Sequence, residues 1–137
     1  MATKKLGFVI RALPYKTEAS RLAMTHAIAS QTVEIYLEDG DLVEPVVCFI
    51  GDGVLNALKN QQAMKNYGIT SLEQHVKNGL LLDLKLMYCK EDLDKFGIKE
   101  DALIMDAEDI GGETKAQIAP YSEIQKEMES VDHLLFF

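Results

Sequence analysis

The sequence has few cysteines, few prolines, no tryptophan and no long hydrophobic run, and these absences exclude several classes of protein. Its 137 residues include two cysteines and three prolines. Cys48 and Cys89 are too few to build a disulfide framework, which favours reduced thiols. The apolar stretch from Leu6 to Leu13 is interrupted by Arg11, and it is too short for a signal-peptide core with a cleavage site or for a membrane span. We therefore expect a cytoplasmic protein with no membrane segment.

Basic residues are also few, and this limits the partners that the surface can attract. Lysine and arginine number 14 against 22 aspartates and glutamates, which gives a net charge of −8. An acidic surface repels phosphate backbones and anionic lipids, so direct binding to nucleic acid or to a membrane surface is not expected. Hydrophobic residues make up 47% and charged residues 26%, as in an ordinary globular domain. A chain of this length predicts a single domain over residues 1–137, with enough core to fold without a metal.

Short apolar runs alternate with segments of helical periodicity along the whole chain. Strands are predicted at 6–10, 43–50, 83–88, 102–105 and 131–137. Helices are predicted after Thr17 and at 54–66, 71–79, 91–96 and 120–128. This alternation predicts an α/β fold, with a mostly parallel sheet of about five strands and helices on both faces.

The predicted helix ends carry recognisable residues. Asp52 is predicted to cap the helix that starts at 54, and Ser71 with Gln74 fits a capping box. Gly68 and Gly97 each follow an aromatic residue at a helix end and precede an isoleucine, which predicts left-handed C-terminal caps. In the first helix, Ala19, Leu22, Ala23 and Ala27 are predicted to form the buried face.

Functional sites of parallel sheets form outside the carboxyl ends of the strands, and Cys89 is the sharpest candidate there. It directly follows a predicted strand and precedes a predicted helix. A helix N-terminus and the adjacent Lys90 favour a thiolate, whereas Glu91 and Asp92 raise a thiol pKa. The sequence leaves open both the direction of this shift and the choice between a functional and a bystander thiol. Cys48 lies in the middle of an apolar strand and is predicted to be a core residue.

Arg11 is a second candidate, because an arginine at the end of an apolar strand needs a partner. It is predicted to form an ion pair with a carboxylate such as Glu18, and the alternative is contact with an anionic sulfur species.

The other polar clusters predict no cofactor chemistry. No CxxC or HxxxH pair is present, and the three histidines His26, His75 and His133 lie far apart in the sequence, so no metal site is expected. The glycine pairs at 51–53 and 111–112 match neither phosphate-binding fingerprint, so no nucleotide is expected. The cluster of acidic residues at 106–109 is predicted to be a solvated loop.

Four segments together resemble the DsrE/TusD-like sulfur-relay family. They are residues 14–19, residues 49–54 with Ala57, Cys89 followed by Gly97 and Ile98, and the last strand at 131–137. The resemblance implies a flavodoxin-like sheet and a homotrimer or hexamer that can include paralogous subunits. It also implies a sulfurtransferase subunit that carries sulfur as a cysteine persulfide, takes it from a donor protein and passes it to an acceptor. The pathway served would be tRNA thiolation or cytoplasmic sulfur oxidation.

The resemblance places the family's sulfur-carrying cysteine on Cys89, and no dissociable cofactor is implied. Arg11, Lys16 and Lys90 are candidates to bind the anionic sulfur substrate. The chain departs from the family pattern after the cysteine, because acidic residues stand at 91, 92 and 94 where small and basic residues are frequent.

Two alternatives stay open at this point. The first is a non-catalytic scaffold subunit of the same fold, in which Cys89 is incidental. The second is a flavodoxin-type binder of a phosphate-bearing ligand, which the net charge and the missing glycine fingerprint disfavour.

Overall fold

The computed structural model describes residues 3–32 and 42–137, and its centre is a five-stranded sheet in which every pairing is parallel. The strands are β1 (Thr3–Ile10), β2 (Leu42–Phe49), β3 (Lys85–Cys89), β4 (Gln117–Ala119) and β5 (His133–Phe136). Their order across the sheet is β4-β3-β2-β1-β5. The predicted α/β class with a parallel five-stranded sheet is confirmed, although this order differs from the 2-1-3-4-5 order of flavodoxin itself.

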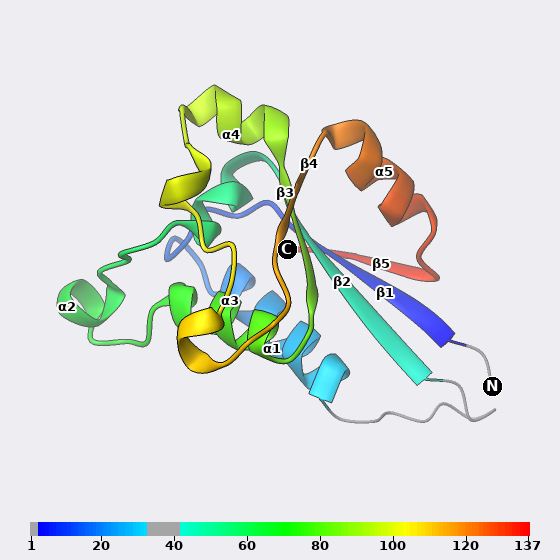
Figure 1. Cartoon of the computed structure of the whole chain (residues 1–137), viewed down its shortest axis with the longest axis horizontal. Helices are drawn as coiled ribbons and strands as arrows, with labels where there is room; N and C mark the ends of the chain where they lie inside the picture. The colour runs from blue at the N-terminus through cyan, green and yellow to red at the C-terminus, as the bar shows by residue number, and fades with distance from the viewer. Residues whose placement is uncertain (1–2, 33–41) are drawn as a thin grey trace.

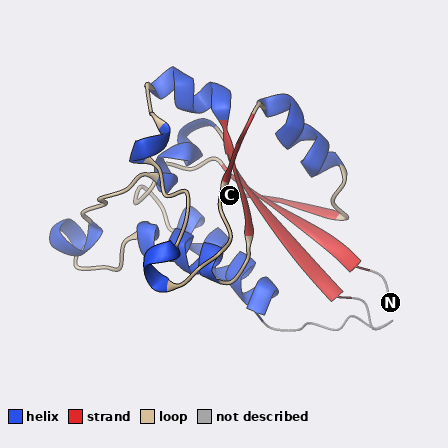
Figure 2. Cartoon of the chain, viewed as in Figure 1, coloured by secondary structure: helices blue, strands red, loops and turns tan. Residues whose placement is uncertain are grey.

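Helices cover both faces of the sheet and its carboxyl edge (Figures 1 and 2). The helices α1 (Ala19–Thr32) and α3 (Leu72–Leu81) pack together on one face, and α5 (Tyr121–Glu129) packs on the other. At the carboxyl edge, α4 (Lys90–Phe96) contacts the 3₁₀ helix η1 (Gly51–Ala57). The remaining short elements are α2 (Ala63–Tyr67), η2 (Glu100–Ala102) and η3 (Glu108–Ile110).

The chain reverses its direction across the sheet after β4. Strands β1 to β4 follow one another outward, and α5 then returns the chain to the far side of β1, where β5 pairs. Because crossovers are right-handed, this reversal places α5 on the face opposite α1 and α3. A topological switch point therefore lies between the carboxyl ends of β1 and β5.

The core lies mainly between the sheet and the α1–α3 layer. Strands β1 and β2 are buried on both faces toward their carboxyl ends, which explains their apolar runs. Strand β3, which was predicted from an alternating pattern, is buried at four of its five residues. Phe49 and Tyr88 meet edge to face with ring centroids 5.4 Å apart. In α1 the buried residues include Ala23, Met24 and Ala27, whereas Leu22 is half exposed, so its predicted place on the buried face is wrong.

The predicted fourth strand at 102–105 is also wrong. Leu103 and Ile104 are buried as expected, but their backbone joins the loops instead of the sheet. The Ile104 N–H donates to the Ala57 carbonyl at 2.8 Å, and the Ile104 carbonyl accepts the Tyr88 hydroxyl at 2.5 Å. The fourth strand is instead Gln117–Ala119, which pairs with the last three residues of β3.

The segment after β2 differs from the single helix predicted at 54–66. It forms η1 from Gly51 to Ala57 and, after a loop, the short helix α2. Asp52 therefore lies in the first turn of η1 and is not its cap, since the N-cap is Ile50. No capping box forms at Ser71 either, because the Ser71 hydroxyl donates to Gln61 O at 3.4 Å and makes no cap bond.

The remaining predicted ends are confirmed. Gly68 and Gly97 adopt left-handed conformations with φ of 69° and 68° at the ends of α2 and α4. The Ile98 N–H then donates to the Leu93 carbonyl at 2.9 Å, as a Schellman cap requires. The Thr17 hydroxyl accepts a hydrogen bond from Ala19 N, the first residue of α1, at 3.2 Å.

Candidate functional site

The carboxyl ends of β1, β2 and β3 converge at one edge, where α4 and η1 meet. The close approach of η1 to β1 depends on Gly53. A Cβ at this position would lie 2.0 Å from the Ile10 carbonyl oxygen. The buried Asn56 side chain adds a second tie between the segments, because its Nδ2 donates to the Ala12 carbonyl at 3.1 Å. The sequence therefore brings the loop after β2 directly against the end of β1.

Cys89 is the last residue of β3 and the N-cap of α4, as predicted. Its side chain is covered, with 1% of the residue exposed. Burial raises the pKa of the Cys89 thiol to about 11, and the Asp92 and Glu91 carboxylates contribute to the rise. The Asp92 backbone N–H acts in the opposite direction but does not compensate. At neutral pH this cysteine is a protonated thiol.

Asp92 links the cysteine to the loop after β2. Its Oδ2 accepts a hydrogen bond from Gly51 N at 2.7 Å. The same carboxylate accepts a hydrogen bond from the Cys89 thiol. Gly51 has a φ of 54°, a left-handed conformation that places this N–H within reach. The carboxylate therefore adds to the effect of burial on the pKa of the Cys89 thiol, and it ties α4 to η1.

Cys48 is a core residue, as predicted. It is fully buried in the middle of β2, and burial raises the pKa of its thiol to about 12. Both cysteines are free.

The three basic candidates do not gather around Cys89. Arg11 and Lys16 are both exposed and line a shallow cavity of about 260 Å³ together with Asp52, and neither Cys89 nor Lys90 lines it. Lys90 is exposed at the start of α4.

The prediction of an ion pair between Arg11 and Glu18 is wrong. Glu18 pairs with Arg21 at 3.5 Å. The guanidinium of Arg11 lies over the ring of Phe136, with its Cζ 5.1 Å from the ring centroid. An exposed arginine needs no buried counterion, so an aromatic face suffices as a contact.

Within residues 3–32 and 42–137, no group of three or more histidine, cysteine or acidic side chains is arranged to hold a metal ion. The acidic loop is solvent-exposed at Glu108 and Asp109, where each pairs with a lysine. No helix among these residues is long and apolar enough to span a bilayer.

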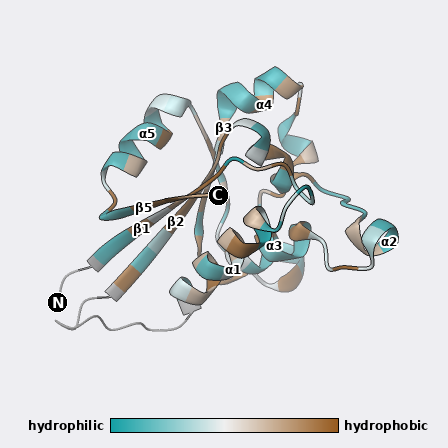
Figure 3. Ribbon diagram, turned by 180° about the vertical axis from the view of Figure 1, so that it is seen from behind, coloured by the Kyte–Doolittle hydropathy of each residue, from teal (hydrophilic) through white to brown (hydrophobic). Residues whose placement is uncertain are grey.

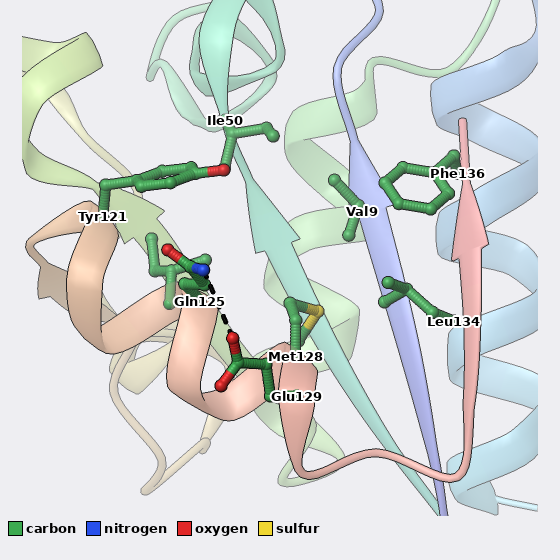
Figure 4. Close-up of a pocket in the computed structure, with 9 residues that line it drawn as sticks. Val9, Ile50, Tyr121, Gln125, Met128, Glu129, Leu134 and Phe136 are labelled. Carbon is green, nitrogen blue, oxygen red and sulfur yellow. Dashed lines mark hydrogen bonds between the residues drawn. The ribbon is translucent and has the colours of Figure 1, made fainter.

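An apolar groove beside α5 was not predicted. It has a volume of about 330 Å³ and lies between α5 and the strands β1 and β5 (Figure 4). Its lining residues are Val9, Ile50, Tyr121, Ile124, Gln125, Met128, Glu129, Leu134 and Phe136. The sequence signal for it is the apolar end of the chain, which predicts a closing strand but does not show that the strand borders a groove.

Comparisons with known proteins identify the family. The model of the DsrE/DsrF-like family matches residues 4–137. The chain belongs to the DsrE/DsrF-like family. A curated relative, the protein TusC homolog of Aliivibrio fischeri, is 28% identical, and the match covers 97% of this chain and 98% of the relative. The crystal structure of the YchN protein from E. coli has a TM-score of 0.70 at 20% identity, covering 98% of this chain and 99% of the other.

The family assignment confirms the resemblance found in the sequence, and the likeness to the YchN structure supports the fold. In this member of the DsrE/DsrF-like family, the carboxyl edge holds a covered thiol beside a carboxylate, and the cations Arg11 and Lys16 lie elsewhere on that edge. Such an arrangement stabilises a protonated thiol rather than an anionic sulfur species.

Proposed function

We propose that this chain is a subunit of a sulfur-relay assembly that contributes mainly through contacts with other protein chains, while Cys89 rests as a neutral thiol. Membership of the DsrE/DsrF-like family and the similarity to a TusC homolog support a sulfur-relay role in general. The assembly would act in the cytoplasm, in tRNA thiolation or in sulfur oxidation. Its other members would be sulfur donor and acceptor proteins and related subunits.

One observation carries this proposal. Cys89 is 1% exposed, and the pKa of its thiol is raised to about 11. Sulfur exchange requires an accessible thiolate, because the thiolate is the nucleophile. In the isolated protomer only about one thiol in ten thousand would be ionised at pH 7, since each pH unit below the pKa costs a factor of ten.

The second candidate is sulfur transfer on Cys89 itself, and its position favours this role. The thiol lies at the carboxyl end of a central strand and at the N-terminus of α4, where a thiolate is stabilised. In this scheme the thiolate attacks the outer sulfur of a donor persulfide. The donor S–S bond breaks, its electron pair leaves on the donor thiolate, and a new S–S bond forms on Cys89. Arg11, Lys16 and Lys90 would then bind the anionic donor, once a partner has uncovered the thiol.

Intact-mass spectrometry separates the two roles. The native chain is incubated with a cysteine desulfurase and cysteine, and separately with polysulfide or thiosulfate. We expect no added sulfur on Cys89 of the isolated chain. Reductant-sensitive sulfur on the native chain that is lost in Cys89→Ser would overturn the subunit role in favour of the carrier role.

A matched variant at the other thiol controls this experiment. Cys48→Ala keeps Cys89 and removes the fully buried thiol of β2. Sulfur that adds to the native chain and to Cys89→Ser, but not to Cys48→Ala, would lie on Cys48 and support neither role. Urea unfolding of both variants verifies that the fold is kept.

A further inference from the structure

Two segments beyond the carboxyl ends of β1 and β2 contain basic residues and no acidic ones. Residues 11–17 follow β1, and residues 59–72 follow η1. All 22 aspartates and glutamates of the chain lie outside these two segments. The basic residues within them are Arg11, Lys16, Lys59 and Lys65. On a chain with a net charge of −8, this separation concentrates positive potential in one part of the surface.

Tyr15 joins the two segments. Its hydroxyl donates a hydrogen bond to Gln61 Oε1 and accepts one from Leu72 N at 2.8 Å. Its ring lies against the ring of Tyr67, with the centroids 5.8 Å apart. Tyr15 has a φ of 66°, a left-handed conformation that is strained for a bulky residue and persists only where the surroundings enforce it. The two segments therefore form one continuous surface, which is named the basic surface below.

Gln61 fixes the shape of the longer segment. Its Nε2 donates to the Asn56 and Leu58 carbonyls, both at 2.9 Å. Its backbone N–H donates to Glu73 Oε1 at 3.1 Å, and Glu73 N donates to Gln61 Oε1 at 3.2 Å. A surface that is held in one conformation loses little entropy when a partner binds.

The basic surface exposes large apolar side chains on this rigid support. Met64 and Tyr67 of α2 are 62% and 63% exposed, and Ile69 is 37% exposed. The helix α2 lies at one end of the molecule, away from the sheet, and Figure 3 colours it partly hydrophilic and partly hydrophobic. Tyrosine and methionine are enriched where proteins bind one another, and neighbouring exposed apolar side chains indicate such a site.

Two of the four cations are available to a partner. Arg11 already lies over an aromatic ring, and Lys59 lines a small cavity together with Glu100. Lys16 and Lys65 are exposed, and neither forms an ion pair with a carboxylate of the described residues. Their charge is uncompensated and therefore complements carboxylates on another molecule.

An acidic protein segment fits this surface better than nucleic acid does. A short peptide can place a few carboxylates on the lysines and its apolar side chains on α2 while it contacts nothing else. Nucleic acid carries a phosphate at every nucleotide, so a strand that extends past the basic surface meets the acidic remainder of the chain.

We infer that the basic surface is a docking site for an acidic segment of another protein. The carboxylates of that segment contact Lys16 and Lys65, and its apolar side chains pack on Met64, Tyr67 and Ile69. The inference rests on the proposed function, because it names the kind of partner that a contact subunit would take.

Fluorescence anisotropy of the full chain with a short labelled peptide of alternating glutamate and leucine measures this binding. We expect saturable binding that Lys65→Glu weakens about tenfold, because the variant replaces an attraction with a repulsion. Tyr67→Ala should also weaken it about tenfold, because it removes the largest exposed apolar contact. A peptide of alternating lysine and leucine should not compete.

Lys126→Glu is the matched control for the charge change. Lys126 is an exposed lysine of α5, on the opposite face of the sheet, and its reversal alters the net charge by the same amount. It should leave the affinity unchanged. Urea unfolding of each variant verifies that the fold is kept.

Amide hydrogen exchange locates the bound peptide and tests the role of Tyr15. The peptide should slow exchange in residues 59–72 and leave α5 and β5, which border the apolar groove, unchanged. Tyr15→Phe keeps the ring but removes the bonds to Gln61 and Leu72. It should speed exchange in residues 59–72 and weaken peptide binding several-fold, because the surface is then less well organised before binding.

Four outcomes would overturn the inference. They are the absence of saturable binding, an affinity that Lys65→Glu does not change, equal binding of the basic peptide, and protection at the groove beside α5 instead of the basic surface. A single-stranded RNA that binds in a Lys65-dependent way while the peptide does not would assign the surface to RNA and likewise overturn it.

Slow exchange of the α2 amides in the free chain that dilution abolishes would assign the surface to a second copy, which also contradicts the inference. None of these results bears on sulfur loading of Cys89, which is the measurement that would overturn the proposed function. The two failures are therefore distinguishable.

Discussion

At the scale of single residues, the carboxyl edge depends on a position that admits no side chain. An added Cβ at Gly53 would lie 2.0 Å from the oxygen and 2.6 Å from the carbon of the Ile10 carbonyl, and backbone atoms of a central strand cannot move aside. We expect Gly53→Ala to lower the free energy of unfolding by roughly 3 kcal/mol, at the upper end of overpacking effects. Gly97→Ala is the control. A Cβ added at Gly97 meets no atom within 4 Å, so this substitution should cost only the strain of an alanine in the left-handed conformation, about 1 kcal/mol. If urea unfolding showed the same loss of unfolding free energy in Gly53→Ala and Gly97→Ala, the steric explanation would be contradicted.

At the same scale, Asp92 contributes to the raised pKa of Cys89. Its carboxylate accepts a hydrogen bond from the protonated thiol and repels a thiolate, so Asp92→Asn should lower the pKa of Cys89 from about 11. Burial, the largest cause, stays in place, so the pKa should remain above the ordinary value of 9.0. The amide oxygen can still accept from Gly51 N, which preserves the link to η1. We expect iodoacetamide to alkylate Cys89 several-fold faster at pH 8 to 9, as measured by peptide mass.

Asp94→Asn is the matched control for this prediction, because Asp94 is an exposed acid of the same helix and does not contribute to the shift. A rate that rises equally in both variants would assign the effect to net charge instead of to the contact with the thiol.

The position of Cys89 could be predicted from the sequence, but its chemical state could not. An apolar run followed by an acidic helical segment indicates a strand that ends at a helix N-terminus, and this local pattern was sufficient. The sign of the pKa shift depends on how deeply the thiol is covered and on the reach of Asp92 to Gly51, which lies 41 positions earlier in the chain. The prediction for Arg11 failed for a similar reason, since its contact is Phe136 at the other end of the sequence.

At the scale of elements, α5 is held on its face of the sheet by few contacts. Its buried residue is Ile124, which is 2% exposed. At the start of the helix, Tyr121 N donates a hydrogen bond to the Glu91 carboxylate at 3.0 Å. Further along, Glu127 forms ion pairs with Lys5 and Lys85. We expect Ile124→Ala to cost about 2 to 4 kcal/mol, as for other buried aliphatic truncations. Amide exchange of α5 should then rise more than that of α1. A uniform loss of protection would show that α5 unfolds only with the whole domain.

The strands also show why elements differ in how well sequence predicts them. Strands β1, β2 and β3 are central and largely buried; β1 and β2 were predicted from their apolar runs, and β3 was predicted from an alternating pattern. Strand β4 has three residues, of which one is buried, so its pairing with β3 leaves almost no hydrophobic signal. The stronger apolar run at 102–105 buries its side chains equally well while its backbone bonds to η1 and to Tyr88. Burial alone does not distinguish a strand from a buried connection.

At the scale of the whole molecule, the two faces of the sheet serve different purposes. The pair α1 and α3 covers one face and supplies the core, whereas α5 alone on the other face leaves the groove and the edge of β5 open. The covered thiol supports the proposal that this DsrE/DsrF-like chain contributes mainly through contacts with other chains.

Both thiols make the fold sensitive to alkaline pH. The pKa values of Cys48 and Cys89 are raised from the ordinary value of 9.0 to about 12 and about 11 in the folded chain. Below pH 9 both thiols are neutral in the folded and unfolded states, and their contribution to stability is complete. Above pH 9 only the unfolded chain releases these protons, so the free energy of unfolding must fall as pH rises toward the folded values. Each thiol should account for about 1 kcal/mol lost between pH 8 and pH 10. Urea unfolding at pH 8, 9 and 10 measures this slope. Cys48→Ala lowers stability at every pH but should flatten the slope, and an unchanged slope would show that other groups cause the alkaline loss.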